Sequence, residues 1–101
     1  TSSFSISSSP KYYPSSGSLA VTGGTSATVQ FGSMSGSGWS FAVQLYNVNT
    51  GNYTPVHIVN SSNPSTTFTD LVDGNFRIYV VNTDPSTSWS GYIYMLYVYL
   101  G

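Results

Sequence analysis

Apolar and polar side chains alternate along most of this chain. Successive residues of a strand point to opposite faces of a sheet, so a half-buried strand shows a period of two residues. No segment shows a helical period, because Gly, Pro, Ser, Thr, Asn and β-branched residues leave no window of good helix formers. The alternation predicts eight strands, near residues 3–7, 18–22, 27–31, 39–46, 55–59, 66–69, 76–81 and 90–100.

The segments between these strands carry residues that favour turns. Gly23-Gly24 and Asn49-Thr50-Gly51-Asn52 can adopt positive φ, and Asn63-Pro64 and Asp84-Pro85 favour the start of a turn. Short strands at regular spacing, without helices to connect parallel strands, are typical of a sandwich or a jelly roll. We therefore predict an all-β fold, an antiparallel β-sandwich or jelly roll of about eight strands in a single domain.

The first 17 residues differ in composition from the rest. Residues 7–18 read SSSPKYYPSSGS, which is typical of a linker. We expect residues 1–17 to form an N-terminal arm or first strand with a Ser- and Pro-rich linker, and residues 18–101 to form the β-sandwich domain. Phe4 and Ile6 have the spacing of one strand face. The arm either adds a strand to a neighbouring molecule or is an ordinary first strand of its own domain.

The last predicted strand is apolar on both faces. Residues 91–101 read GYIYMLYVYLG, with Tyr92 and Tyr94 on one face and Tyr97 and Tyr99 on the other. In a sandwich only one face of a strand packs into the core, and a contiguous exposed apolar face usually marks an interface. The charged residues that normally protect sheet edges are scarce, since the chain has one Lys. The pattern predicts self-association through these four tyrosines together with Phe4 and Ile6.

Charge limits the classes of partner. Charged residues make up 5% of the chain and the formal net charge is −1, whereas about 25% of residues are charged in ordinary globular proteins. No basic stripe is present to bind nucleic-acid phosphates, and no apolar run reaches the roughly 20 residues of a transmembrane helix. The chain has no Cys and is rich in Ser, Thr, Asn and Tyr. It begins with Thr1, which agrees with removal of a signal peptide. We expect a secreted, extracellular protein at the cell surface.

Two stretches resemble known families. TFTDLVDGNFRIYVVN, residues 67–82, resembles the corner of many secreted β-sandwich modules of bacterial surface proteins. The resemblance implies that Phe68 and Leu71 close one end of the core and that Gly74 turns into the next strand. SGYIYMLYVY, residues 90–99, resembles the last strand of jelly-roll subunits in spore-appendage-type fibres of Gram-positive bacteria. Such fibres use Cys cross-links, which this chain cannot form.

Residues with catalytic chemistry are few. His57 is the one His of the chain, and no Gly-x-Ser-x-Gly motif is present, since Met34 stands at the centre of residues 32–36. Val56 and Ile58 are expected on the inner face of their strand, which puts His57 on the outer face. Three carboxylates stand at turns and lack a calcium-loop signature: Asp70, Asp73 and Asp84. We predict no enzyme activity, no cofactor and no metal site.

Aromatic side chains supply a second interpretation of the chain. Trp39, Trp89 and the nine Tyr residues can stack on sugar rings, with Gln44, Asn and Asp side chains as hydrogen-bonding partners. In the structural alternative, Trp39 begins a core strand and Trp89 closes one end of the sandwich.

The leading interpretation is a secreted, non-enzymatic structural subunit. It would assemble with copies of itself into a fibre or cell-surface layer by strand addition and through its aromatic face. The alternative is a carbohydrate- or cell-surface-binding, lectin-like module whose partner is a glycan. A small secreted toxin or inhibitor is a further alternative.

Overall fold

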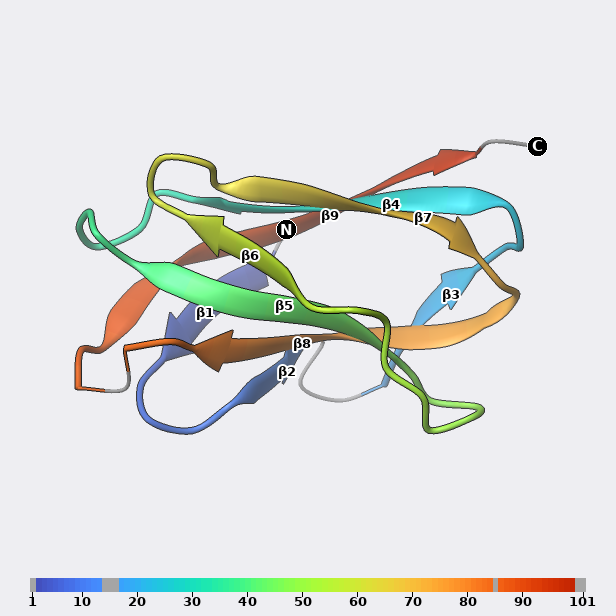
Figure 1. Ribbon diagram of the computed structural model, residues 1–101, viewed down its shortest axis with the longest axis horizontal. Coiled ribbons are helices and arrows are strands. Elements are labelled where there is room, and N and C mark those ends of the chain that lie inside the picture. Colours follow the sequence, from blue (N-terminus) through green and yellow to red (C-terminus); the bar gives the residue numbers. More distant parts are fainter. Residues whose placement is uncertain (1, 14–16, 85, 100–101) are drawn as a thin grey trace.

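The computed structural model describes residues 2–13, 17–84 and 86–99, with side chains for all of these except residues 2, 25 and 95–99. Two antiparallel sheets pack face to face (Figure 1). The described ranges contain no helix, which confirms the all-β antiparallel class, and the two layers agree with a β-sandwich. Within these ranges there is accordingly no helix long and apolar enough to cross a membrane. The strands are β1 (Ser2–Ile6), β2 (Lys11–Tyr13), β3 (Leu19–Val21), β4 (Thr25–Gly32), β5 (Ser40–Asn47), β6 (His57–Asn60), β7 (Ser65–Leu71), β8 (Gly74–Asn82) and β9 (Trp89–Tyr99).

The first and last strands lie side by side in one sheet. This sheet has the order β1-β9-β4-β7 and is called the β9 sheet. The second sheet has the order β2-β8-β5-β6, with β3 also paired to β8, and is called the β8 sheet. β2 and β3 follow one another along the same edge of β8, because β5 occupies its other edge. β9 is therefore an inner strand, paired with β1 along residues 89–93 on one edge and with β4 along residues 92–99 on the other (Figure 1).

The core lies between the sheets and is filled from alternating strand positions. In β5 every second residue is buried, from Phe41 to Asn47. The rings of Phe4, Phe31 and Phe41 form a triangle with centroid distances of 5.1, 5.2 and 5.4 Å. Aromatic pairs of this kind contribute about 0.5–1.5 kcal/mol beyond their burial. The triangle joins β1 and β4 of one sheet to β5 of the other.

A bulge in β7 explains the spacing of the corner motif. Thr25 pairs with Leu71 and Ala27 with Phe68, so three positions of β7 oppose two of β4. Asp70 takes up the extra residue with a φ of 56°, which is the conformation that an inserted residue adopts in some bulges. Phe68 and Leu71 therefore both point into the core although they are three residues apart, and both are buried.

The inner face of β6 is the reverse of the predicted one. β6 pairs with β5 so that Val59 lies opposite Phe41, and Ile58 lies opposite Ala42. Val59 is buried and His57 is partly buried, whereas Val56 and Ile58 are 53% and 52% exposed. The assignment of Val56 and Ile58 to the core was wrong. Apolar residues occupy both faces of this segment, so the alternation alone does not show which face points into the core.

Two strands lie in the described part of the first 17 residues. Of the two alternatives left open for the N-terminus, the structure has the ordinary first strand, since β1 pairs with β9 of the same chain. Residues 11–13, in the segment expected as a linker, form β2 against β8. Three residues flanked by Ser and Pro give no usable period, so this strand depends on its pairing with residues 78–80 and not on a local signal.

Candidate functional site

Phe4 and Ile6, named for strand addition to a neighbour, belong to the core of their own chain. Both are buried, and β1 places Phe4 opposite Gly91 and Ile6 opposite Trp89. Releasing β1 to another molecule would expose both side chains and would leave residues 89–93 of β9 without the strand that pairs with them. In this state of the protein they are not available for self-association.

Of the four tyrosines of β9, Tyr92 and Tyr94 have described side chains. Ile93 is buried, so its face of the strand meets the core, and Tyr92 points outward and is 45% exposed. Tyr94 is partly buried and its ring lies over Gly32, where a Cβ atom would come within 3.1 Å of the ring. Tyr97 lies at the register position opposite Ala27 and Tyr99 opposite Thr25, and the side chains of these two lie outside the described residues.

The two tryptophans pack against the core. Trp39 is buried and stacks on Phe41, with ring centroids 4.9 Å apart and planes 22° from parallel. Trp89 is partly buried at the start of β9, and its Nε1 atom is buried without a hydrogen-bond partner among the described residues. Trp39 therefore presents no face to a ligand, as in the structural alternative.

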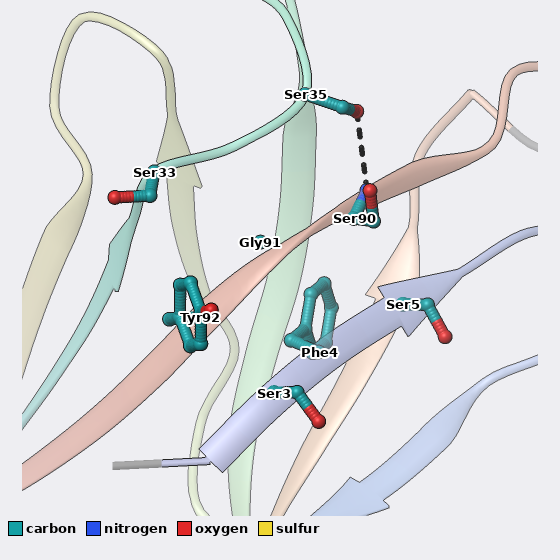
Figure 2. Close-up of a pocket in the computed structure, with 8 residues that line it drawn as sticks. All are labelled: Ser3, Phe4, Ser5, Ser33, Ser35, Ser90, Gly91 and Tyr92. Atoms are coloured by element: carbon teal, nitrogen blue, oxygen red, sulfur yellow. Dashed lines mark hydrogen bonds between the residues drawn. The ribbon is translucent and has the colours of Figure 1, made fainter.

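A pocket lies on the β9 sheet beside Tyr92 (Figure 2). Its volume is 430 Å³, and its lining consists of Ser3, Phe4, Ser5, Ser33, Ser35, Ser90, Gly91 and Tyr92. The loop after β4 is held over β9 by two hydrogen bonds: Ser35 N donates to the Ser90 carbonyl at 2.7 Å, and Ser90 N donates to Ser35 Oγ at 3.2 Å. The pocket offers hydroxyl groups and one exposed phenol ring, with no Asp, Glu, His, Lys or Arg in its lining.

A cluster of four tyrosines covers the outer face of the β8 sheet. Tyr12 comes from β2, Tyr79 from β8, Tyr46 from β5, and Tyr53 from the loop after β5. Tyr12 lies opposite Tyr79 in the strand register, and Tyr53 forms a bridge with Tyr46. Pairing alone therefore places two tyrosine pairs next to each other on one surface. We call these four residues the tyrosine cluster.

Each ring of the tyrosine cluster contacts two others. The centroid distances are 4.8 Å for Tyr12 and Tyr79, 5.3 Å for Tyr79 and Tyr53, 4.8 Å for Tyr53 and Tyr46, and 5.7 Å for Tyr46 and Tyr12. The hydroxyls of Tyr12 and Tyr53 are 2.7 Å apart and close the cluster with a hydrogen bond. This hydrogen bond, followed by partial desolvation, raises the pKa of Tyr53 above 10.0.

The loop that carries Tyr53 is tied back to β5. Thr54 N donates to the Leu45 carbonyl at 3.0 Å, and Leu45 N donates to Thr54 Oγ1 at 2.8 Å. Gln44 Nε2 donates to the Thr54 carbonyl at 2.8 Å. These bonds fix the backbone after the ring, and a hydrogen bond of 2.8 Å from Asn47 N to the Asn52 carbonyl fixes it before the ring. The Tyr53 side chain stays 45% exposed.

The surroundings of the tyrosine cluster are almost free of formal charge. The Arg77 guanidinium lies 4.7 Å from the centroid of the Tyr12 ring, a cation–π distance. Beyond the rings, the face continues with Ala42, which pairs with Ile58 on one side and Val81 on the other. The outer face of the β8 sheet thus combines phenol rings, aliphatic side chains and the Gln44 amide.

His57 and the carboxylates at the turns make contacts of a structural kind. His57 Nδ1 lies 2.7 Å from Thr66 Oγ1, and its ring stacks on Phe68, so it serves as a packing residue between β6 and β7. Asp73 accepts a hydrogen bond from Gly23 N, and Asp84 accepts from Ser86, as expected of turn formers. In the part of the chain that the structure describes, no group of three His, Cys, Asp or Glu residues gathers to hold a metal ion.

Sequence reasoning named the tyrosines as a class of sugar-stacking residues but did not single out these four. The alternation was a usable signal for Tyr46 and Tyr79, which stand between buried residues and therefore face outward. Tyr12 and Tyr53 lie in segments expected as linker and loop.

The chain matches no protein family model, and comparison with curated proteins and with solved structures finds no significant similarity.

Proposed function

We propose that this protein is a non-enzymatic, extracellular carbohydrate-binding module that receives a glycan on the outer face of its β8 sheet. The tyrosine cluster carries this proposal. It gathers four rings on one surface of a sheet, and phenol rings present an apolar body for the C–H face of a sugar together with a hydroxyl for hydrogen bonding. This was the second interpretation from the sequence, and the burial of Phe4 and Ile6 in their own core now gives it precedence.

The chemistry of the face favours a neutral glycan. The rings carry no formal charge, and Arg77, the cation beside them, lies against the Tyr12 ring. The Gln44 side chain and the phenol hydroxyls supply neutral donors and acceptors at the same surface. The rings come from three strands and a loop, and such an extended array suits a chain of several sugars lying along it better than a single enclosed sugar.

Titration calorimetry with neutral oligosaccharides tests the proposal. Cello-, xylo-, manno- and chito-oligosaccharides are the probes, with an oligogalacturonate as the acidic comparison. Replacing Tyr46 or Tyr79 by Ala removes a stacking ring and is expected to weaken binding about tenfold or more, the equivalent of roughly 1.4 kcal/mol. Tyr92→Ala is the control, since Tyr92 is an exposed tyrosine, 45% exposed like Tyr53 of the cluster, and lies on the other sheet.

The results for these variants show which of the two sheets carries the glycan-binding site. Binding that is lost in the Tyr46 and Tyr79 variants and kept in the Tyr92 variant supports the proposal. Loss in the Tyr92 variant alone would move the site to the serine-lined pocket. Absence of binding to every probe by the folded protein would remove the proposal.

Self-association is a second candidate function, favoured by Val56 and Ile58. Both side chains are more than half exposed, and Ile58 lies opposite Ala42 on the β8 sheet, whose outer face carries the tyrosine cluster. Exposed apolar surface often marks an interface between proteins. The assembly would form through this face and not through exchange of β1. Sedimentation equilibrium tests it: an average mass that rises with concentration, and that returns to the monomer value in Ile58→Lys, would support assembly over glycan binding.

A further inference from the structure

The hydroxyl oxygens of Tyr12 and Tyr53 lie 2.7 Å apart although the residues are 41 positions apart in the chain. Tyr12 stands on β2 at the edge of the β8 sheet, and Tyr53 stands on the loop after β5. The hydrogen bonds of Leu45 and Thr54 hold that loop, and the pairing of Tyr12 with Tyr79 holds β2. The two phenols are therefore brought together by backbone that is fixed on both sides.

This arrangement matches the position of the two hydroxyls in a coupled pair of phenols. One-electron oxidation of a phenol gives a phenoxyl radical whose unpaired electron is shared with the ring carbons next to the hydroxyl carbon. Two such radicals join through these ortho carbons, and in the product the two hydroxyls flank the new bond and hydrogen-bond to each other. Tyr12 and Tyr53 already hold their hydroxyls at hydrogen-bond distance, as the coupled product does, and rotation of the two rings must then bring the ortho carbons together.

We propose that Tyr12 and Tyr53 form an intramolecular dityrosine cross-link, with hydrogen peroxide as the oxidant and a haem peroxidase as the catalyst. Each phenol loses one electron and one proton, and a carbon–carbon bond forms between the ortho carbons. The hydrogen on each joined carbon then moves to the oxygen and restores the two hydroxyls. The peroxide takes up the two electrons and two protons and leaves as two molecules of water.

The surroundings favour this pair of residues. Tyr53 is 45% exposed and so is accessible to the oxidant, and the chain has no Cys to consume oxidising equivalents. Tyr46 and Tyr79 touch the ring of Tyr53, at 4.8 and 5.3 Å, in tilted and edge-on geometries. Tyr46 and Tyr79 can exchange an electron with a Tyr53 radical. The hydroxyl–hydroxyl contact, however, is the one between Tyr12 and Tyr53.

The cross-link would join the β2 edge to the far side of its own sheet. It closes a loop from residue 12 to residue 53 in the unfolded chain, which lowers the conformational entropy of that state as a disulfide does. The melting temperature of the cross-linked protein is therefore expected to rise by several degrees. The cross-link depends on the geometry of the tyrosine cluster and is independent of whether this face binds a glycan.

The test treats dilute, folded, full-length protein with horseradish peroxidase and hydrogen peroxide. Expected results are dityrosine fluorescence and a monomer that has lost two hydrogen atoms by intact mass spectrometry. Peptic digestion is needed for mapping, because Lys11 and Arg77 are the sole tryptic sites and trypsin would leave Tyr12 and Tyr53 in one fragment. The cross-linked peptides should contain residues 12 and 53.

Phe substitutions make the result specific. Tyr12→Phe and Tyr53→Phe each remove one phenol and should reduce the intramolecular product to background. Tyr46→Phe and Tyr79→Phe keep the reacting pair and should retain it, and protein unfolded in urea should lose it. The proposal is overturned if the link maps to other tyrosines, if it persists in Tyr53→Phe, or if covalent dimers form in place of the cross-linked monomer.

Discussion

The imidazole ring of His57 lies against the phenyl ring of Phe68, with centroids 4.1 Å apart and planes 13° from parallel. His57 belongs to β6 of the β8 sheet and Phe68 to β7 of the β9 sheet. A hydrogen bond of 2.7 Å between His57 Nδ1 and Thr66 Oγ1 joins the same two strands. This contact closes one side of the sandwich. The sequence pattern had predicted His57 on the outer surface, and that prediction was wrong.

Replacing His57 by Ala is expected to lower the free energy of unfolding by about 1–2 kcal/mol. The change removes a stacked ring pair and a side-chain hydrogen bond, each worth about 1 kcal/mol. Urea denaturation followed by tryptophan fluorescence measures it. Thr66→Val removes only the hydrogen bond and should cost less. A His57→Ala variant as stable as the parent would mean that the stacking contributes nothing.

Period and composition predicted much of the fold but not the faces of every strand. A strand is present at each of the eight expected places, because alternation over four or more residues is a signal of a half-buried strand. β2 was missed, since residues 11–13 owe their conformation to pairing with β8. The inner face of β6 was assigned wrongly because Val56, Ile58 and Val59 occupy both parities.

The contacts within the tyrosine cluster could not be predicted from the alternation either. Alternation placed Tyr46 and Tyr79 on outward positions, yet it carried no information on which outward residues would meet. Contact between Tyr12 and Tyr53 depends on β2 pairing with β8 and on the loop folding back along β5. Long-range pairing of this kind is a property of the whole topology and not of any short window of sequence.

A methyl group at Gly91 has no room. A Cβ atom there would lie 2.5 Å from Met34 Sδ and 2.9 Å from the Gly32 carbonyl oxygen. Gly91→Ala is therefore expected to destabilise the fold by about 1–3 kcal/mol, the usual range for overpacking. Adding Met34→Ala should restore little, because the backbone contact remains.

Gly36→Ala is the matched control for this prediction. Its Cβ atom would meet one atom of the Trp89 ring at 3.2 Å, and that side chain can shift. Thermal unfolding of the three variants measures the differences. An unchanged melting temperature for Gly91→Ala would contradict the close packing of the β4–β5 loop on β9.

Asn82 ties two loops to the end of β8. This buried residue donates from Nδ2 to the carbonyls of Ser7 at 3.1 Å and Thr87 at 2.7 Å, and its Oδ1 accepts from Asp84 N at 3.1 Å. Asn82→Ala leaves these groups without their partner and should cost about 2 kcal/mol of unfolding free energy. Asn75→Ala, an exposed Asn on the same strand, should change stability by less than about 0.5 kcal/mol.

Asp84 is expected to titrate below its ordinary pKa of 3.8. The hydrogen bond from Ser86 Oγ is the main cause of the lowered pKa, and Thr87 Oγ1 adds to it. A lowered pKa in the folded state means that the contribution to stability is present above about pH 4 and is lost as the pH falls through the folded pKa. NMR titration of the carboxyl carbon should show the pKa rising in Ser86→Ala. An identical titration curve in that variant would rule out Ser86 as the cause.

Tyr12→Phe should return the pKa of Tyr53 toward 10.0. In the parent protein the Tyr12–Tyr53 hydrogen bond raises the pKa of Tyr53, because it favours the neutral phenol over the phenolate. A pKa that is higher in the folded than in the unfolded state gives a stabilising contribution that is present below about pH 10 and is lost as the pH rises through the folded value. The stability of the parent should therefore fall more steeply above pH 10 than that of Tyr12→Phe. Absorbance titration of phenolate, with difference spectra of Tyr53→Phe to assign the signal, measures the pKa directly. Should Tyr53 ionise at the same pH with and without the Tyr12 hydroxyl, the hydrogen bond between them does not persist in solution, and the preorganisation on which the cross-link depends is lost with it.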